Sequence, residues 1–356
     1  MTDDFNPKLN LHQLLIALKD NIGVLDYFGA KAYDSTQQKQ ISNLILAFDD
    51  LISYFLWHPE KITTDYKPYI LRVFKMHPND DPNIIHLLEL CAKCIITALK
   101  SQVKTVIQPS DFSFSNVIEH VNSEKYSDEA IIDFLEIIFT ISDKQASDIA
   151  NADPHDIDKF FKYYDKFDKL SKISCLKCIN NIVSHQVFAR FVIFLPILLD
   201  IASDPEQSIS QLAIQAFITI SKEISDINTN ISENFNPLEY CQKLCKFTCA
   251  YKDLRYLGIF IDSIRACIIS SAYTIQTVFS IMTSFLIKVF ENISETSVLR
   301  SSIRLILALM PYPDDDLIQL YPDQEFKWTN KEFISKTTFS IAKEVIPHIL
   351  RIYYTN

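Results

Sequence analysis

Two Cys-x-x-Cys pairs are the residues of this sequence whose type and spacing most suggest chemistry. Cys91 and Cys94 lie in "ELCAKCI", and Cys175 and Cys178 lie in "SCLKCIN". The two pairs could supply the four ligands of a structural zinc site, or act through their thiols. A zinc site wants convergent ligands, usually from tight turns, whereas each pair here is surrounded by apolar residues at helical spacing. We therefore favour packing in a core, with a zinc or thiol function as the alternative.

The other candidate motifs indicate chemistry less strongly. His185 follows "NNIVS" and could cap a helix, and no catalytic partner is visible for it in the sequence. The three aspartates at 314–316 could hold a cation, but a loop with a helix-capping aspartate explains them equally well. The stretch "FFKYYDKF" alternates aromatic residues and lysines, as base-stacking surfaces do. At helical spacing, four of its aromatic residues share one apolar face: Phe160, Phe161, Tyr164 and Phe167.

Composition narrows the function class further. Only 3 of the 356 residues are glycine. Phosphate-binding loops, nucleophile elbows and tight hairpins rely on glycine because it adopts positive φ without strain. The formal net charge of −10 disfavours nucleic-acid binding, which depends on lysine and arginine, and favours a protein or peptide partner of basic character. We expect no cofactor and no catalytic residue.

The N-terminal "MTDDFNPKLN" is acidic and is therefore no secretory signal. The strongest apolar run, at 191–202, is shorter than the roughly 20 residues of a membrane-spanning helix. We expect a protein of the cytoplasm, the nucleus or both, without a membrane partner. Its 8 cysteines are then expected to be reduced thiols.

Apolar residues recur at steps of three and four almost throughout the chain, which predicts helices. Clear examples are the segments 11–22, 41–56, 83–99, 130–142, 170–183, 211–224, 277–293 and 301–310. Proline, asparagine, aspartate and serine mark the breaks, and each break offers a capping residue to the next helix. The predicted fold class is all-α.

A repeat becomes visible around residues 195–221, where an apolar helix, a polar turn and a second helix follow one another. The second helix places small residues at Ala213 and Ala216. Shifting the template back by 38 residues puts Cys175 and Cys178 on these positions, and a further 84 residues puts Cys91 and Cys94 there. The cysteines then fill a recurring slot for small side chains. The run of Cys241, Cys245 and Cys249 at i, i+4 and i+8 has the same interpretation.

This template resembles the armadillo repeat, and the order of segments resembles one family more closely. The stretches that carry the likeness are "LHQLLIALKDN" and residues 66–101, 134–204 and 305–315, the last with "LMPYPD". Together they are similar to the non-catalytic armadillo region of the thyroid-receptor-interacting and ubiquitin-fusion-degradation ligases of the HECT type. The resemblance implies a right-handed α-solenoid of armadillo or HEAT-like repeats, about seven to nine at ~40 residues each. We expect a single domain over 1–356, with an N-terminal cap (1–40), repeats (41–310), and an acidic loop with capping helices (311–356).

In that family a catalytic domain with a thioester-forming cysteine follows the armadillo region. No residue here matches that cysteine, and the last one, Cys267, lies in the helical "IDSIRACIIS". The expected function is therefore a non-enzymatic scaffold that recognises substrates or other ubiquitin-system components. A general adaptor for transport or the cytoskeleton is the alternative.

Stacked repeats present their inner helices as one extended binding strip. By template position, the residues expected to line this strip are Lys93, Thr97, Lys177, Asn181, Gln215, Thr219 and Arg304. Ordinary solvated polar residues are the alternative interpretation for each of them.

Overall fold

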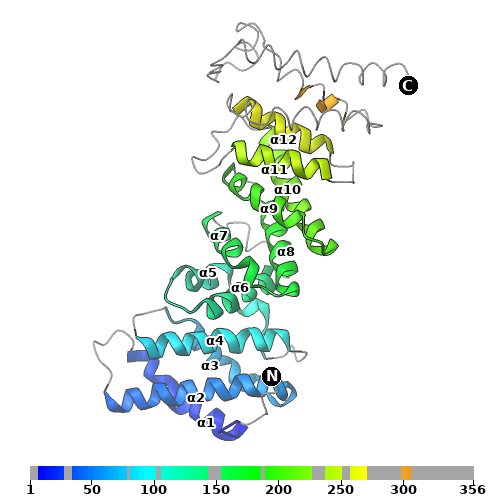
Figure 1. The fold of residues 1–356 in the computed structure, drawn as a ribbon. Helices are drawn as coiled ribbons and strands as arrows, with labels where there is room; N and C mark the ends of the chain where they lie inside the picture. Colours follow the sequence, from blue (N-terminus) through cyan, green and yellow to red (C-terminus); the bar gives the residue numbers. More distant parts are fainter. Residues whose placement is uncertain are drawn as a thin grey trace, which may run out of the picture. The chain divides into compact units, whose positions relative to one another are not determined.

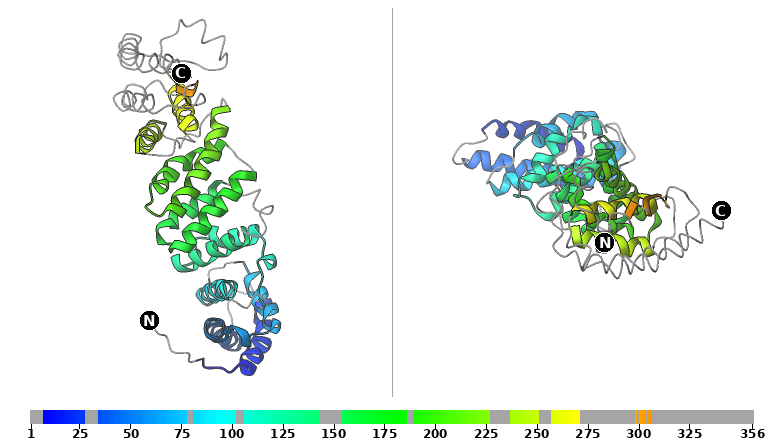
Figure 2. Two further views of the ribbon diagram at one scale, coloured as in Figure 1. Left: turned by 90° about the vertical axis from the view of Figure 1, so that its right-hand side faces the viewer. Right: turned by 90° about the horizontal axis from the view of Figure 1, so that it is seen from above.

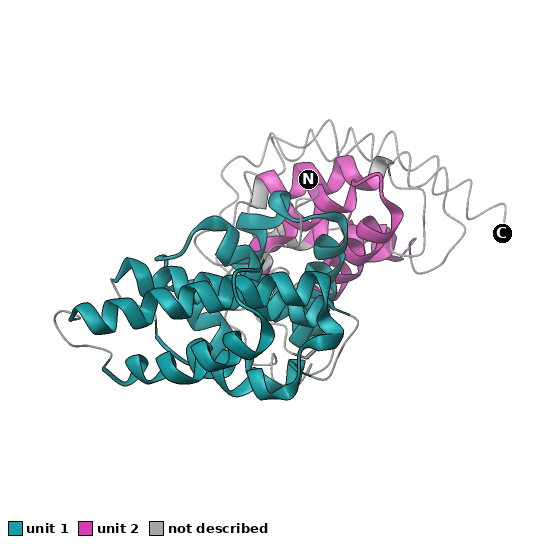
Figure 3. Ribbon diagram, turned by 90° about the horizontal axis from the view of Figure 1, so that it is seen from below, with its two compact units in different colours: residues 1–186 teal, residues 187–356 magenta. Residues whose placement is uncertain are grey.

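The computed structural model describes residues 7–27, 34–77, 81–101, 106–142, 154–185, 189–226, 237–250, 257–270, 298, 300–302 and 304–305. Within these ranges the regular segments are helices, and no strand occurs among them (Figure 1). The predicted all-α class is confirmed. The helices group into two compact units, residues 1–186 and residues 187–356 (Figure 3). The acidic loop and capping helices expected over 311–356 lie outside the described residues.

In unit 1 the α-helices are α1 (Leu11–Asn21), α2 (Ser35–Trp57), α3 (Lys67–Phe74), α4 (Pro82–Lys100), α5 (Phe114–Asn122), α6 (Asp128–Ser142), α7 (Pro154–Tyr163) and α8 (Lys169–His185). Short 3-10 helices lie between them: η1 (Ile22–Tyr27), η2 (Pro59–Lys61), η3 (Thr64–Tyr66), η4 (Pro109–Asp111) and η6 (Tyr164–Lys166). Helices α2, α4, α6 and α8 contact one another in that order, and the views of Figure 2 show them from two further sides. The shorter helices α1, α3 and α5 each pack on the long helix that follows. We call α2, α4, α6 and α8 the long-helix layer.

Unit 2 contains η7 (Ala189–Phe194), α9 (Leu195–Ala202), α10 (Gln207–Asp226), α11 (Pro237–Ala250) and α12 (Leu257–Ser270). Helix α9 packs on α10 and α11, while α12 packs on α10 and α11. The pairing of a short helix with the long helix that follows it therefore recurs in α9 and α10, whereas α11 and α12 each have 14 residues.

Polar side chains begin the helices, as the breaks in the sequence predict. Asn10 and Asp34 each form a reciprocal capping box with the glutamine three residues later, and Asp81 accepts a hydrogen bond from the backbone of Asn83. Each such cap stabilises its helix by about 1 kcal/mol. Between α5 and α6 the chain turns at Glu124, whose φ of 56° lies in the region that glycine adopts most easily. The chain thus turns here without using glycine.

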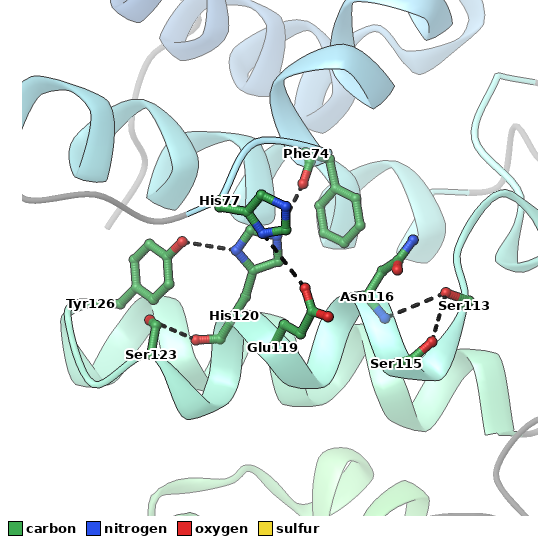
Figure 4. A network of polar contacts seen from close by, with 9 residues as sticks. All are labelled: Phe74, His77, Ser113, Ser115, Asn116, Glu119, His120, Ser123 and Tyr126. Atoms are coloured by element: carbon green, nitrogen blue, oxygen red, sulfur yellow. Dashed lines mark hydrogen bonds and ion pairs between the residues drawn. The ribbon is translucent and has the colours of Figure 1, made fainter. Parts of the chain in front are cut away.

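His120 of α5 ties three helices together inside unit 1 (Figure 4). Its Nε2 lies 3.0 Å from the carbonyl oxygen of Phe74, the last residue of α3. Because that carbonyl can only accept, Nε2 carries the proton, and Nδ1 accepts from the Tyr126 hydroxyl at 2.8 Å. The imidazole also stacks on Phe134 of α6, with 4.8 Å between ring centroids. A polar ring is therefore held in the core with both nitrogens satisfied.

This arrangement predicts a loss of stability in acid. Burial lowers the pKa of His120 below its ordinary value. As the pH falls, the histidine of the unfolded chain takes up a proton at about pH 6.5, whereas the folded chain takes it up only at lower pH. Protonation therefore favours the unfolded chain, and the stability that neutral His120 contributes at higher pH is lost as the pH falls below about 6.5. In urea unfolding at pH 8 and pH 5.5, the wild type should lose more stability on acidification than His120→Gln. The exposed His12→Gln serves as control and should follow the wild type. An equal loss in the wild type and His120→Gln contradicts the argument.

Candidate functional site

The cysteines of both Cys-x-x-Cys pairs are completely buried. Cys91 donates a hydrogen bond from its thiol to the carbonyl oxygen of Ile70, with 3.5 Å between sulfur and oxygen. Burial raises the pKa of Cys91, Cys94 and Cys175, because a thiolate would lose its hydration there. Side chains of this kind are protonated thiols that pack as small hydrophobic residues. Cys241 and Cys245 are likewise buried, whereas the side chains of Cys249 and Cys267 lie outside the described part of the chain.

The remaining candidate motifs are placed as follows. In "FFKYYDKF", Phe160, Tyr164 and Phe167 are buried, and the rings of Phe160 and Phe167 pack edge-on against Phe139. Phe161 is half-buried, and α7 ends at Tyr163, so three of the four predicted residues lie in the core but the four do not share one helical face. Among the described residues, no group of three His, Cys, Asp or Glu side chains lies close enough to hold a metal ion. The side chain of His185 and the aspartates at 314–316 are not described.

The packing of the thiols generates a test. Cys175→Ala with Cys178→Ala should fold and lose only about 1 kcal/mol of stability per site, as for other small deletions from a core. The matched pair Cys175→Leu with Cys178→Leu adds volume to the same positions and should lose more, by about 1–3 kcal/mol per site. Chemical unfolding and the metal content of the wild type, measured side by side, check this. Stoichiometric zinc that disappears in the alanine pair would establish the metal interpretation instead.

Four of the residues expected to line a binding strip lie in the long-helix layer. Lys93 of α4 and Lys177 of α8 are exposed, and Thr97 and Asn181 are half-buried one turn later. Thr97 donates its hydroxyl proton to the carbonyl oxygen of Lys93 at 2.6 Å. Asn181 instead donates from Nδ2 to the Ser142 hydroxyl at 3.1 Å and so joins α8 to α6. Each pair therefore lies on the solvent side of its helix.

The structure adds two pairs that the sequence template missed. Glu136 and Thr140 occupy the equivalent place in α6, and Asp49 and Ser53 occupy it in α2. As in α4, the hydroxyl of the second residue donates to the carbonyl of the first, at 2.9 Å in α6 and 3.2 Å in α2. We call these four pairs the polar ladder: Asp49 and Ser53, Lys93 and Thr97, Glu136 and Thr140, Lys177 and Asn181.

A shared burial pattern shows that the four pairs are equivalent. In each helix the two residues before the first member of the pair are buried, and so are the three residues between the two members and the one after the second. A helix with this pattern meets solvent along a single stripe. The segments "EIIFT" at 136–140 and "KCIIT" at 93–97 carry the sequence signal for the missing pair in α6. The template overlooked α6 because Phe134 and Ile137, rather than small residues, fill the positions that the cysteines fill in α4 and α8.

The other expected residues lie in unit 2. Gln215 of α10 is exposed, and Thr219 donates to its carbonyl oxygen at 3.0 Å, with the same burial pattern around the pair. Arg304 is exposed in the short described stretch near residue 300. The polar ladder thus unites Lys93, Thr97, Lys177 and Asn181 in unit 1, while the remaining three residues belong to unit 2.

The electrostatics of the polar ladder centre on α6. Glu136 is only 12% exposed, and its carboxylate lies 2.5 Å from the Lys100 ammonium of α4. Its second oxygen accepts a hydrogen bond from the Ser171 hydroxyl of α8. One carboxylate therefore links three helices of the layer, and its charge is neutralised within the fold.

Asp133, one turn earlier on α6, has no such partner among the described residues. It is half-buried and carries neither a hydrogen bond nor an ion pair. Burial first, and the neighbouring Glu136 second, raise the pKa of Asp133 to about 7, although Lys93 and Lys100 oppose the shift. The solvent stripe of α6 therefore contains a carboxylate that the fold itself does not neutralise.

The pKa of Asp133 predicts a second pH effect with the opposite sign. The unfolded chain releases this proton near pH 4 and the folded chain only near pH 7, so folding costs more as the pH rises through this window. Asp133→Asn should therefore gain stability relative to the wild type by about 1–2 kcal/mol at pH 8, a figure that allows for screening by water, and little at pH 4. Urea unfolding at both pH values measures the difference. The exposed Asp20→Asn should show no such dependence, and a gain for Asp133→Asn that is equal at both pH values would refute the assignment.

Unit 2 contains a surface pocket of about 460 Å³ between α9 and α11. Its lining includes Asp200, Lys243, Lys246 and Phe247. Lys243 is committed to structure, because its ammonium lies 2.8 Å from Asp200 and 3.3 Å from Glu239. These ion pairs, with Asp200 first, raise the pKa of Lys243. The polar groups of this pocket thus mainly join α9 to α11.

No protein-family model and no curated protein matches the chain. Within the described residues one helix, α4, is long and apolar enough to cross a membrane. Half of that stretch is buried against the rest of the structure, and core helices of soluble proteins pass the same criterion.

Proposed function

We propose that this chain is a non-catalytic scaffold that binds a protein or peptide along an armadillo or HEAT-like solenoid. The observation that carries the proposal is the polar ladder, because it repeats one solvent-facing pair on each of the four helices of the long-helix layer. A row of this kind on packed repeats forms an extended strip suited to a linear segment of a partner.

The spacing of the contacts between helices supports a repeat architecture. In unit 1, hydrogen bonds join residues 38 apart from Ser127 to Glu89, 36 apart from Lys100 to Glu136, and 39 apart from Asn181 to Ser142. In unit 2, Lys243 and Asp200 are 43 residues apart. Contacts at a distance of about one repeat are typical of solenoids, in which each repeat touches its neighbours. That one right-handed array runs through both units is part of the proposal.

The resemblance to the armadillo region of the HECT-type ligases suggests which process the scaffold serves. The scaffold would recognise a degradation substrate or another component of a ubiquitin ligase. The buried state of the Cys-x-x-Cys pairs favours this over a thiol or zinc function, because neither pair presents a thiolate or an accessible sulfur ligand.

Affinity capture from cell extract tests this function. Mass spectrometry compares the partners captured by the wild type, by Lys177→Glu and by the matched control Lys19→Glu. Both lysines are exposed, and Lys19 lies on α1, outside the long-helix layer. Ubiquitin-conjugating enzymes, ligase subunits or ubiquitylated proteins should be retained by the wild type and Lys19→Glu and lost from Lys177→Glu.

Two results would count against the proposal. If Lys177→Glu captures the same partners as the wild type, the polar ladder is not the binding strip. If capture of the partners depends on Lys177 but none of them belongs to the ubiquitin system, the result supports a binding scaffold and contradicts its role in degradation.

A further inference from the structure

The first members of the polar ladder alternate in charge along the layer. From α2 to α8 they are Asp49, Lys93, Glu136 and Lys177. Each of the four helices packs directly on the next, so each charge has an opposite charge on the neighbouring helix. The order is negative, positive, negative, positive.

These charges are available to a ligand to different degrees. Asp49, Lys93 and Lys177 are exposed, and within the described residues their charged groups form no hydrogen bond or ion pair. Glu136 is engaged by Lys100 and Ser171. On α6 Asp133, one turn away on the same stripe, is a carboxylate without a hydrogen bond or ion pair among the described residues. At pH 8, where Asp133 is mostly ionised, each of the four helices therefore places at the ladder, or one turn from it, a charge without a hydrogen bond or ion pair among the described residues, and the alternation is kept.

The hydroxyl groups of the ladder also have a defined polarity. Ser53, Thr97 and Thr140 all donate their protons inward, to the carbonyl oxygen of the residue four positions earlier. What each hydroxyl still offers to solvent is an acceptor oxygen. A ligand can thus place donors, such as backbone N–H groups, along the row.

The helix spacing sets the step of a complementary ligand. Packed helices lie about 8–10 Å apart, and an extended chain advances about 3.3 Å per residue. One helix step therefore corresponds to about three residues of an extended peptide. A ligand that follows the ladder meets a charge of opposite sign at every third position.

We propose that the polar ladder of unit 1 selects an extended peptide whose charge alternates at every third residue, with basic residues against Asp49 and Asp133 and acidic residues against Lys93 and Lys177. The inference rests on the proposed scaffold function and specifies its ligand. It differs from the simple expectation that an acidic protein prefers a basic partner, because here the order of charges, rather than their sum, determines affinity.

Three labelled peptides of equal length test the order directly by fluorescence anisotropy with the 356-residue protein at pH 8, where Asp133 is mostly ionised. The first is Lys-x-x-Glu-x-x-Lys-x-x-Glu, the second is Lys-x-x-Lys-x-x-Glu-x-x-Glu, and the third has lysine at all four positions, with x as alanine or serine. The first two have the same composition and net charge. We expect the alternating peptide to bind about ten-fold more tightly than the block peptide, and its binding to weaken as salt is added.

A charge reversal in the protein provides the matching control. Lys93→Glu with Lys177→Glu makes all four ladder charges negative and changes two exposed side chains, so helical content and melting temperature should stay close to those of the wild type. This variant should lose its preference for the alternating peptide and bind the all-lysine peptide most tightly. The same double reversal at the exposed Lys19 and Lys39 should leave the order of affinities unchanged.

Equal affinity for the alternating and block peptides overturns the proposal, as does tightest binding of the all-lysine peptide to the wild type. Failure of all three peptides to bind also overturns the charge-order inference. The scaffold function is decided separately, by whether capture of partners from extract depends on Lys177. The two proposals can therefore fail independently.

Discussion

Burial of the long helices on every side but one is the constraint on which the rest of unit 1 depends. Each helix of the layer is buried around the first member of its ladder pair, both before and after it. Since an α-helix repeats every 3.6 residues, only a narrow stripe of positions is left for water. Residues outside the stripe must pack, and residues on it are free to carry charge. The same constraint that builds the core thus decides where the surface chemistry of this layer can be.

Two carboxylates of α6 have different roles in this arrangement. Glu136 accepts from α4 on one side and from α8 on the other, so it fixes the register of three helices. A carboxylate that is 12% exposed needs this much support, because burial of an unpaired charge is costly. Asp133 has no such partner among the described residues, and burial of its charge therefore raises its pKa. The carboxylate that joins the helices, Glu136, and the carboxylate without a described partner, Asp133, therefore lie one helical turn apart.

The sequence allows much of this fold to be predicted, and particular residues show where prediction stops. Apolar spacing identifies the helices, and Asp81 and Asn10 begin helices as capping rules require. The sequence predicts a repeat from the cysteine positions, because Cys91, Cys175 and Ala213 are all small. Phe134 breaks this rule, since its slot in α6 faces the His120 ring, and only the structure reveals that partner. The pair in α6 could therefore not be found by looking for small residues, whereas α2 has the small Ala47 at the first of these positions and Asp50 at the second.

The paired thiols of the core also allow the local stability of single helices to be measured. Two completely buried sulfur atoms lie in each of three helices, α4, α8 and α11. A buried thiol reacts with a reagent in solution only when its helix opens, so the rate of modification reflects the free energy of that local opening. Cys91, Cys175 and Cys241 would then act as gauges at three separate places along the chain. Under the proposed repeat architecture, in which each repeat contacts mainly its neighbours, these thiols would react independently of one another.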